Sequence, residues 1–360
     1  MKIKKALYLT HPEQDFGEQF LFTGLCQVLE DENVVTYPYK KTYYGETAND
    51  YILDDGKTGY TEPSAWVVPK KPNKWEYDEI KRRMDEFDII VLSSPRTYAV
   101  RAAEQIAKDF NGVFPKPLIF TEHEDGDNIR FDIINKFRPS VVFKREMTEL
   151  IKGVFPLPFS CSYEGVPKCN DIEKEIDVFA LFGNTHELRA RTIAKVLDAR
   201  LDALGYNVHV GIDTGGSRVF LVPKVIVGRL HEDRKFFFTI PPLQPWKKYM
   251  ESIAKSKIAI AVRGWGRDTV RRWEIPASNT MMLECDCGIL TPYPFVDKVT
   301  CVRFKEDLSD LIDIIVYYLE HDDEREAIAK RGHEHLLKYH TTEKRAEYFL
   351  DIVEKELKAN

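Results

Sequence analysis

The sequence lacks any apolar run that approaches the length of about 20 residues needed by a membrane-spanning helix. Near its start, the apolar stretch Ala6 to Leu9 is too short for the core of a signal peptide. Cysteine is scarce as well, with six scattered residues in 360, which excludes a disulfide framework. We therefore expect a cytoplasmic protein with reduced thiols.

Neither sign of charge dominates the chain, which has 52 lysines and arginines, 58 aspartates and glutamates, and a formal net charge of −6. This balance argues against a polyanion held mainly by electrostatics, although it leaves room for a local basic cleft. Metal-binding patterns are missing too, because Cys285 and Cys287 are too closely spaced for a zinc knuckle and no second pair follows. We expect no required metal.

What the sequence does contain is enough apolar material for a sizeable core, since 43% of its residues are hydrophobic and 31% are charged. A chain of 360 residues exceeds what one core usually covers, so two domains are expected. Short apolar, β-branched runs alternate with longer amphipathic segments, a pattern typical of a parallel sheet covered by helices. The predicted class is α/β, with two Rossmann-like domains.

Composition shifts along the chain predict the domain boundaries. A first domain is expected over 1–170, with a loop insertion near 41–73 and a proline-bearing linker near 155–170. A second domain is expected over 171–340, and a terminal helix within 341–360. The predicted strands lie at 5–9, 34–37, 88–93, 118–121, 141–143, 177–182, 207–210, 257–262, 280–284 and 298–304, and the predicted helices at 17–29, 99–110, 187–204, 307–320, 323–339 and 342–358.

The richest segment for chemistry is 256–284, where a buried strand runs into a glycine-containing loop and then a short helix. Ligands of α/β sheets bind beyond the carboxyl ends of the strands, where helix N-termini offer free N–H groups to anions. Guanidinium groups suit a pair of phosphates, and glycines let the backbone approach them closely. The loop supplies both residue types: Arg263, Gly264, Gly266, Arg267, Arg271 and Arg272.

The short helix in this segment is limited by its proline. Pro276 is tolerated in the first turn of a helix, so we expect the helix to begin close to Glu274 and to end near Asn279 in a left-handed conformation. Glu274 then faces the crevice, where its carboxylate would accept hydrogen bonds from the two hydroxyls of a ribose. The alternative is a solvated arginine-rich face, with Glu274 as an ion-pair partner.

With these residues the segment resembles the C-terminal domain of glycosyltransferases of the B-type (GT-B) fold, and in particular the spore-maturation CgeB-like family. The resemblance includes an R-x-x-E-like element from Arg271 to Glu274 and a terminal His-Thr-x-x-x-Arg element formed by His340, Thr341 and Arg345. It covers about a quarter of the chain well. The N-terminal half adds the similar segment FDIIVLSSPR.

The resemblance implies a transferase that moves a sugar from a nucleoside diphosphate donor to an acceptor hydroxyl. It also implies two domains that face each other across a cleft, with the C-terminal helix packing back on the first. Glu274 then becomes the ribose ligand, and Arg263 and Arg267 the diphosphate ligands. The remaining members of the expected donor site are Gly183, Asn184, Arg189, Gly264 and Arg271.

Two positions depart from the family pattern. Asn279 stands where the family often has glycine, and Gly266 stands where retaining enzymes of this fold commonly carry a second glutamate. The second departure removes the basis for predicting whether the anomeric configuration is kept. It also keeps a second hypothesis open, namely a non-catalytic nucleotide- or glycan-binding protein of the same fold.

A glycosyl transfer needs a group that takes the proton of the acceptor hydroxyl, and the acidic run 122–127 follows a predicted strand. His123, Glu124 and Asp125 are the candidates. Neighbouring carboxylates are expected to raise one another's pKa and to favour His123 as a cation. The alternative is a solvated loop or a helix N-terminal turn. The run lacks a defined metal-ligand frame.

A third hypothesis makes a modified DNA base the acceptor. The net charge of −6 makes this hypothesis less favoured, whereas a local basic cleft would support it. The donor base and sugar, the acceptor (glycan, protein, small molecule or modified DNA base) and the oligomeric state are not indicated by the sequence.

Overall fold

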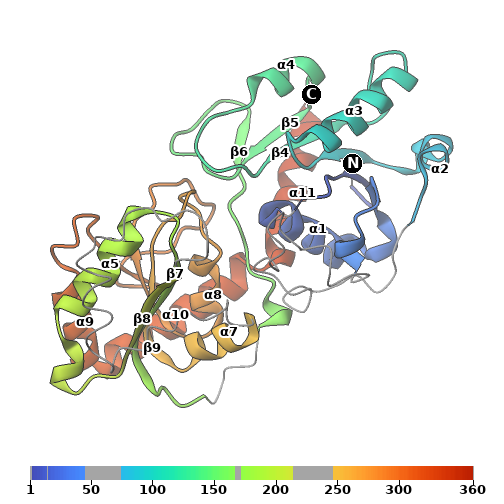
Figure 1. The fold of residues 1–360 in the computed structure, drawn as a ribbon. Helices are drawn as coiled ribbons and strands as arrows, with labels where there is room; N and C mark the ends of the chain where they lie inside the picture. The colour runs from blue at the N-terminus through green and yellow to red at the C-terminus, as the bar shows by residue number, and fades with distance from the viewer. Residues whose placement is uncertain (1, 14, 45–73, 167–171, 214–245, 360) are drawn as a thin grey trace. The chain divides into compact units, whose positions relative to one another are not determined.

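The computed structural model describes residues 2–13, 15–44, 74–166, 172–213 and 246–359, and these form two compact units (Figure 1). Unit 1 consists of Met1–Gly165, Ile289–Pro292 and Tyr339–Asn360. Unit 2 consists of Val166–Gly288 and Tyr293–Lys338. Most of the insertion expected near 41–73, and part of the linker expected near 155–170, lie outside the described residues.

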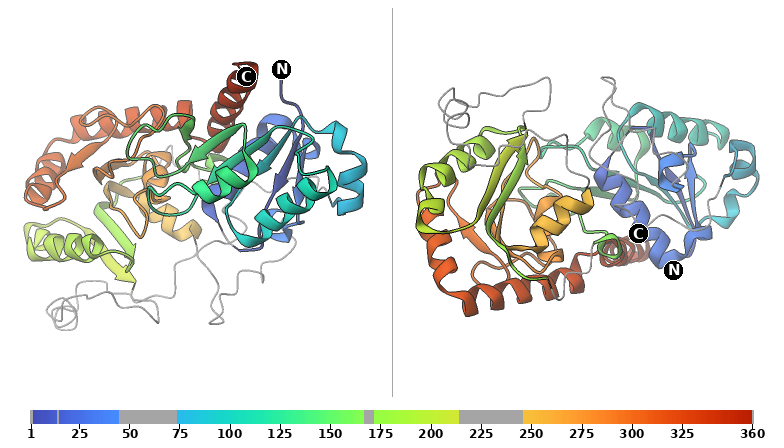
Figure 2. Two further views of the ribbon diagram at one scale, coloured as in Figure 1. Left: turned by 90° about the horizontal axis from the view of Figure 1, so that it is seen from above. Right: turned by 60° about the horizontal axis from the view of Figure 1, so that its bottom comes forward.

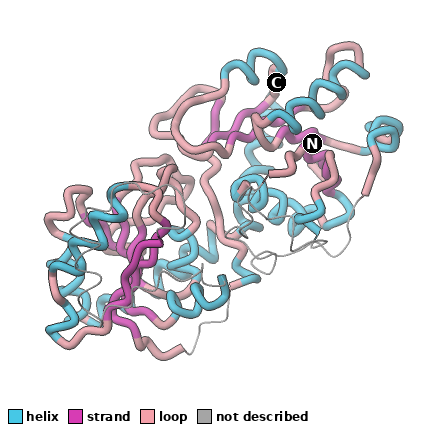
Figure 3. Tube along the Cα trace, viewed as in Figure 1, coloured by secondary structure: helices cyan, strands magenta, loops and turns pink. Residues whose placement is uncertain are grey.

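Unit 1 is built on a six-stranded sheet in the order β2-β1-β3-β4-β5-β6, in which every neighbouring pair is parallel. Strands are drawn in magenta in Figure 3. Its strands are β1 (Ala6–Leu9), β2 (Val34–Tyr37), β3 (Ile89–Leu92), β4 (Leu118–Glu122), β5 (Val141–Lys144) and β6 (Val154–Pro156). β6 was not expected, because three residues at the edge of a predicted linker carry no periodic signal. Pro156 fits there because an edge strand tolerates a residue that cannot donate a ladder hydrogen bond.

Helices cover both faces of this sheet, and one of them comes from the end of the sequence. They are α1 (Phe16–Leu29), α2 (Tyr77–Arg82), α3 (Thr97–Asp109), α4 (Phe131–Phe137) and α11 (Thr342–Ala359). Phe22 and Leu25 of α1 share a buried core with Phe349 and Val353 of α11. The two chain ends lie side by side in Figure 2, and the Ile3 N–H donates to Glu354 Oε1 at 2.8 Å. The expected packing of the C-terminal helix on the first domain is confirmed.

Unit 2 contains a second parallel sheet, in the order β11-β10-β9-β7-β8. Its strands are β7 (Ile176–Gly183), β8 (Val208–Asp213), β9 (Ser256–Ala261), β10 (Met281–Cys285) and β11 (Val302–Phe304). Its helices include α5 (Glu187–Asp198), α7 (Trp246–Ala254), α8 (Arg271–Ala277), α9 (Leu311–Glu320) and α10 (Asp322–Tyr339). The predicted α/β class with two Rossmann-like sheets is confirmed.

Both sheets contain a point at which the strand order reverses. In unit 1 the chain runs from β1 outward to β2 and then returns to β3 on the other side of β1. In unit 2 it runs from β7 outward to β8 and then returns to β9 on the other side of β7. Loops diverge beyond the carboxyl ends of the strands at such a point and leave room for a ligand. The residues following β1, β3, β7 and β9 are therefore the first place to look for chemistry.

The short helix near Glu274 differs from its expected form. α8 begins at Arg271, three residues before Glu274, and Pro276 lies next to its last residue rather than in its first turn. Proline lacks an N–H, so it withholds a hydrogen bond from the Arg272 carbonyl, and the helix ends one residue later. Asn279 has φ 51°, which confirms the expected left-handed conformation after the helix.

Candidate functional site

In unit 2 the loops after β7 and β9 are joined by one side chain. Arg189, from the first turn of α5, donates from Nη1 to the Gly183 carbonyl and from Nε to the Arg263 carbonyl, each at 3.0 Å. The structure thus brings together three of the residues expected at the donor site. Because Arg189 donates these N–H groups to backbone carbonyls, it ties the loop after β7 to the loop after β9.

The absence of a side chain at Gly264 leaves room for the Arg189 guanidinium. A β-carbon on Gly264 would lie 2.9 Å from Arg189 Nη2 and 3.0 Å from Thr185 Oγ1. Asn184 and Thr185 directly precede α5, whose N-terminus is capped by the His186 imidazole: Nδ1 accepts from the Leu188 N–H at 3.1 Å. The free N–H groups of α5 therefore begin beside the arginine-bearing loop, where they favour an anion.

Two arginines of the loop after β9 keep donors available. Arg263 donates from Nη2 to the Trp265 carbonyl at 3.4 Å, and its buried Nε has no hydrogen-bond partner among the described residues. Arg267 donates from Nη1 to the Cys287 carbonyl at 3.1 Å. Both side chains are half-buried. A guanidinium carries five N–H donors, so each of these retains capacity for an anionic ligand.

The arginines of α8 are anchored more fully. Arg271 donates from Nε to the Tyr249 hydroxyl at 2.7 Å and from Nη2 to the Leu181 carbonyl, with its guanidinium carbon 4.6 Å from the centre of the Phe182 ring. Arg272 is buried and donates from Nε to Glu284 Oε2 at 2.9 Å. Arg272 therefore acts within the core, and Arg271 ties α8 to the end of β7.

Glu274 is more enclosed than a crevice-facing residue would be. Glu274 is only 7% exposed, and its Oε1 accepts a hydrogen bond from Trp246 Nε1 at 2.9 Å. Burial raises the pKa of this carboxyl, while the Trp246 hydrogen bond and the Arg271 charge act in the opposite direction. No ion pair to Glu274 is formed by the described residues. The role of Glu274 as a ribose ligand stays a prediction.

In unit 1 the acidic run follows β4 as expected, but its histidine is not a surface cation. His123 is 5% exposed, and neither ring nitrogen has a hydrogen-bond partner among the described residues. Burial lowers the pKa of His123 to about 4, against the opposing pull of the Asp15 carboxylate. The expectation that carboxylates would favour the imidazolium was wrong, because desolvation outweighs their charge. The imidazole is therefore neutral at pH 7, and its burial makes it a weaker base than a solvated histidine.

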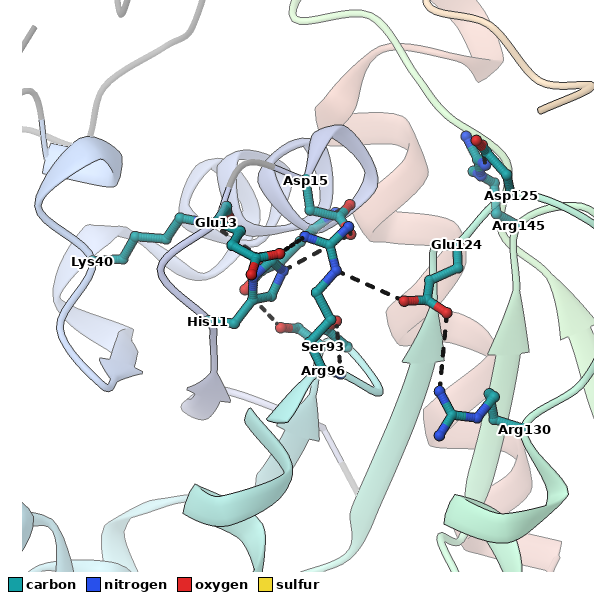
Figure 4. A network of polar contacts seen from close by, with 12 residues as sticks. His11, Glu13, Asp15, Lys40, Ser93, Arg96, Glu124, Asp125, Arg130 and Arg145 are labelled. Carbon is teal, nitrogen blue, oxygen red and sulfur yellow. Dashed lines mark hydrogen bonds and ion pairs between the residues drawn. The ribbon is translucent and has the colours of Figure 1, made fainter. Parts of the chain in front are cut away.

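Glu124 and Asp125 are held by arginines. Glu124 lies 3.8 Å from Arg96 Nε through Oε1 and 4.0 Å from Arg130 Nη1 through Oε2. Asp125 forms an ion pair with Arg145 (Figure 4). These contacts hold the two carboxylates in place, which suits a role in orienting other groups. Of the three expected catalytic residues, His123 is the one whose side-chain nitrogens have no hydrogen-bond partner among the described residues.

Sequence reasoning missed a buried polar cluster at the carboxyl ends of β1 and β3. Glu18 of α1 is fully buried, and its Oε2 lies 3.0 Å from His11 Nε2 and 3.2 Å from Lys40 Nζ. Its Oε1 accepts a hydrogen bond from Ser93 Oγ at 2.8 Å. Burial raises the pKa of Glu18, but the Lys40 and His11 charges overcome it, so the pKa is lowered overall. The carboxyl stays ionised.

Asp15 links this cluster to His123. Its Oδ1 accepts from the Glu18 N–H at 3.0 Å and caps α1, while its Oδ2 lies 3.9 Å from His11 Nε2 (Figure 4). Burial raises the pKa of Asp15, but His123, the cap hydrogen bond and Arg96 bring it below the usual value. The D-x-x-E spacing of Asp15 and Glu18 ahead of an apolar run was the available sequence signal, because it is typical of a helix N-terminus.

Within the described ranges, no group of three or more His, Cys, Asp or Glu side chains is arranged to hold a metal ion. Nor is any helix in the described part of the chain long and apolar enough to cross a membrane.

Comparison with known proteins finds a family match in the C-terminal part of the chain. Residues 225–351 match the model of a family described as glycosyl transferase-like. No curated protein matches the sequence. The match spans the loop after β9, α8 and α10, and so includes the arginine-bearing loop of unit 2.

Solved structures match the whole chain at low sequence identity. A glycosyltransferase from Rickettsia africae aligns with a TM-score of 0.61 and 11% identity, covering 99% of this chain and 100% of that one. HepE from Anabaena in complex with UDP gives 0.59 and 12%, covering 98% and 100%. A sucrose-phosphate synthase from Thermosynechococcus elongatus gives 0.57 and 11%, covering 99% of both chains. The fold is GT-B, and the chain carries a glycosyltransferase domain.

Proposed function

We propose that this glycosyltransferase takes its sugar from a nucleoside diphosphate donor, bound by unit 2 at the carboxyl ends of β7 and β9. The observation that carries the proposal is the pair Arg263 and Arg267, which keep guanidinium donors available at the reversal point of the sheet. The HepE structures with UDP and with UDP-glucose support the choice of donor class.

In this proposal Arg263 and Arg267 bind the diphosphate, together with the N-terminal turn of α5. The backbone at Gly183, Asn184 and Gly264 approaches the phosphates, because Gly264 has no side chain to block it. Arg189 and Arg271 hold these elements in place through their bonds to backbone carbonyls. We assign the ribose hydroxyls to Glu274, whose carboxylate has lone pairs beyond those that Trp246 and Tyr249 occupy.

The reaction forms a bond between the acceptor oxygen and the anomeric carbon and breaks the bond between that carbon and the diphosphate oxygen. The electron pair of the broken bond goes to the diphosphate, whose growing charge is neutralised by the two arginines and the dipole of α5. The acceptor proton goes to a base, and we assign that role to the neutral imidazole of His123. Asp15 then stabilises the imidazolium. Glu124 and Asp125 orient the acceptor.

The finer resemblance to the spore-maturation CgeB-like family is part of the proposal. It is supported by the R-x-x-E-like element from Arg271 to Glu274 and by the buried pair of His340 and Arg345, in which Arg345 Nη2 lies 2.9 Å from His340 Nδ1. The cytoplasm remains the proposed location, and we propose no required metal.

The test is a thermal-shift screen with uridine, guanosine, cytidine and thymidine diphosphate sugars. A donor that binds the folded state raises its melting temperature by mass action. We expect one donor class to stabilise the wild type, the Arg263→Gln variant to lose most of that response, and the exposed control Arg101→Gln on α3 to keep it. If no donor stabilises the wild type at millimolar concentration, the proposal fails.

Donor-dependent transfer then separates an enzyme from a binding protein. We expect the stabilising donor to release its diphosphate in the presence of an acceptor mixture, and His123→Gln to slow that release while the donor-induced thermal shift persists. A donor that binds without turnover in any acceptor mixture would favour a non-catalytic nucleotide-binding protein.

A further inference from the structure

We propose that the acceptor is an uncharged saccharide, bound at the carboxyl edge of the unit 1 sheet. This inference rests on the proposed function and narrows its acceptor. The surface concerned, called the unit 1 edge below, consists of the residues that follow β1, β3 and β4 and begin α3 and α4. Its described side chains are Glu13, Asp15, Arg96, Tyr98, His123, Glu124, Asp125, Arg130 and Phe131.

The cations of the unit 1 edge are already bound to carboxylates. Arg96 donates from Nη1 to Glu13 Oε2 at 2.8 Å, and its Nε also lies 3.8 Å from Glu124 (Figure 4). Arg130 donates from Nη2 to Asp132 Oδ2 at 2.7 Å and lies 4.0 Å from Glu124. Each guanidinium therefore has its charge neutralised before any ligand arrives, which leaves little attraction for a phosphate.

The buried cations that follow β4 and β5 are also paired with carboxylates. Lys144 donates to Glu122 Oε1 at 3.0 Å, and Arg145 contacts both Asp125 and Glu146, the latter at 3.1 Å. Carboxylates outnumber cations in this network, and those of Glu13 and Asp125 are exposed. A polyanion would meet a net negative field here, which lowers both its association rate and its affinity. This disfavours DNA as the acceptor.

Two exposed aromatic residues lie close in sequence to the paired arginines. Tyr98 follows Arg96 by two residues and is 53% exposed, and Phe131 directly follows Arg130 and is 56% exposed. Each lies in the first turn of its helix, α3 or α4. Exposed rings interleaved with carboxylates and guanidinium groups suit a ligand that has apolar faces and many hydroxyls. A pyranose ring offers both: C–H groups for the aromatic face, and hydroxyls that donate to carboxylates and accept from arginines.

The buried histidine directly follows β4, one of the strands that end at this edge. His123 directly precedes Glu124, is 5% exposed, and leaves both ring nitrogens without a hydrogen-bond partner among the described residues. Burying an unpaired polar group costs free energy that a purely structural position does not repay. A ligand hydroxyl would supply the missing partner. The combination of unpaired imidazole, paired charges and exposed rings therefore indicates a neutral polyol rather than an anion.

The experiment measures transfer by the full chain to two acceptor sets, with the stabilising nucleotide sugar as donor. The first set contains uncharged di- to hexasaccharides, and the second contains double-stranded DNA and phosphorylated saccharides. We expect transfer to members of the first set, with an acceptor KM that changes less than about twofold between low and high salt because a neutral ligand releases no counterions.

A variant pair tests the aromatic contribution. Tyr98→Ala combined with Phe131→Ala should raise the acceptor KM about tenfold, because each ring contact is worth a factor of about two to ten. Tyr317→Ala, which removes a 44% exposed ring from α9 in unit 2, is the matched control and should leave the acceptor KM unchanged. The donor-induced thermal shift should be the same in all three proteins, which shows that they are folded and bind donor.

The outcomes separate this inference from the function on which it rests. Absence of any donor response in the wild type contradicts the proposed function itself. A normal donor response with transfer only to DNA or phosphorylated saccharides overturns the saccharide assignment alone. So does an acceptor KM for the uncharged set that is equal in the double variant and the wild type.

Discussion

Gly17, in the first turn of α1, lies so close to His123 that a β-carbon at position 17 would stand 2.4 Å from Nδ1 of the imidazole. Real β-carbons do not approach other atoms this closely, so a larger residue must push the ring or the helix away. The glycine therefore fixes the position of the histidine that we assign as the base.

Replacing Gly17 by alanine should consequently lower stability and activity together. Alanine usually stabilises a helix by up to about 1 kcal/mol relative to glycine, whereas overpacking costs about 1–3 kcal/mol. We expect a net loss, measured by urea denaturation, and a reduced kcat. In a His123→Gly background the same substitution should destabilise much less, because the imidazole and the His123 β-carbon, which would lie 2.8 Å from the added carbon, are both absent. Equal effects of Gly17→Ala in both backgrounds would contradict the contact.

The low pKa of His123 makes stability depend on pH. The imidazole titrates at about 4 in the folded chain, and at about 6.5 in an unfolded one. Between these values the unfolded chain binds a proton that the folded chain does not, so stability falls as the pH drops from about 6.5 to about 4. The shift corresponds to about 3 kcal/mol. Urea denaturation at pH 7.5 and pH 4.5 should show a smaller loss for His123→Gln than for the wild type, and equal losses would refute the assignment.

The two backbone bonds made by Arg189 predict a selective effect on donor binding. Arg189→Lys retains the charge but cannot span the Gly183 and Arg263 carbonyls as a planar fork does. We expect the donor KM to rise about tenfold, a loss of roughly one hydrogen bond to a charged group. Arg191→Lys on the exposed face of the same helix should leave the donor KM unchanged.

Gly264 provides an independent check of the same contact. Gly264→Ala should weaken donor binding, because its β-carbon would displace the Arg189 guanidinium from 2.9 Å. The thermal stability of the ligand-free protein should change little, since the end of a long side chain moves easily. Adding Gly264→Ala to Arg189→Ala should then have a smaller effect than adding it to the wild type. Independent, additive effects would count against coupling between the two residues.

The fully buried Glu18 carboxylate predicts a large loss of stability on truncation. Glu18→Ala leaves the Lys40 ammonium buried without its carboxylate partner, a change that costs about 3–5 kcal/mol. Glu18→Ala combined with Lys40→Met should recover much of that loss, because no uncompensated charge remains. The measurement is chemical denaturation of the three proteins. A double variant as unstable as the single one would show that Lys40 is not the main partner.

The sequence pattern predicted the fold well where periodicity is strong. The strand at 34–37 was located at its exact bounds, because a short β-branched run marks it. The helix predicted at 342–358, whose apolar residues recur with a helical period, stops one residue before the end of α11. The pattern was least informative for α2, α4 and β6, which are too short to show a period.

The polar cluster around Glu18 could not be read from the sequence in the same way. Its partners His11, Lys40 and Ser93 come from three separate loops, and only the strand order of the sheet brings them together. The pKa of His123 was misjudged for a related reason. Adjacent carboxylates are visible in the sequence, whereas the burial that outweighs them depends on the packing of α1 across the end of β4.

The contact between α1 and α11 has a consequence for how the chain is made. Gly24 of α1 approaches the start of α11 so closely that a β-carbon there would lie within 3 Å of the Thr342 carbonyl. During translation, the ribosome synthesises α11 only after all of unit 2, so until then the first unit has the apolar face of α1 uncovered. In this interval the uncovered apolar face of α1 would be the clearest binding site for a chaperone on this polypeptide.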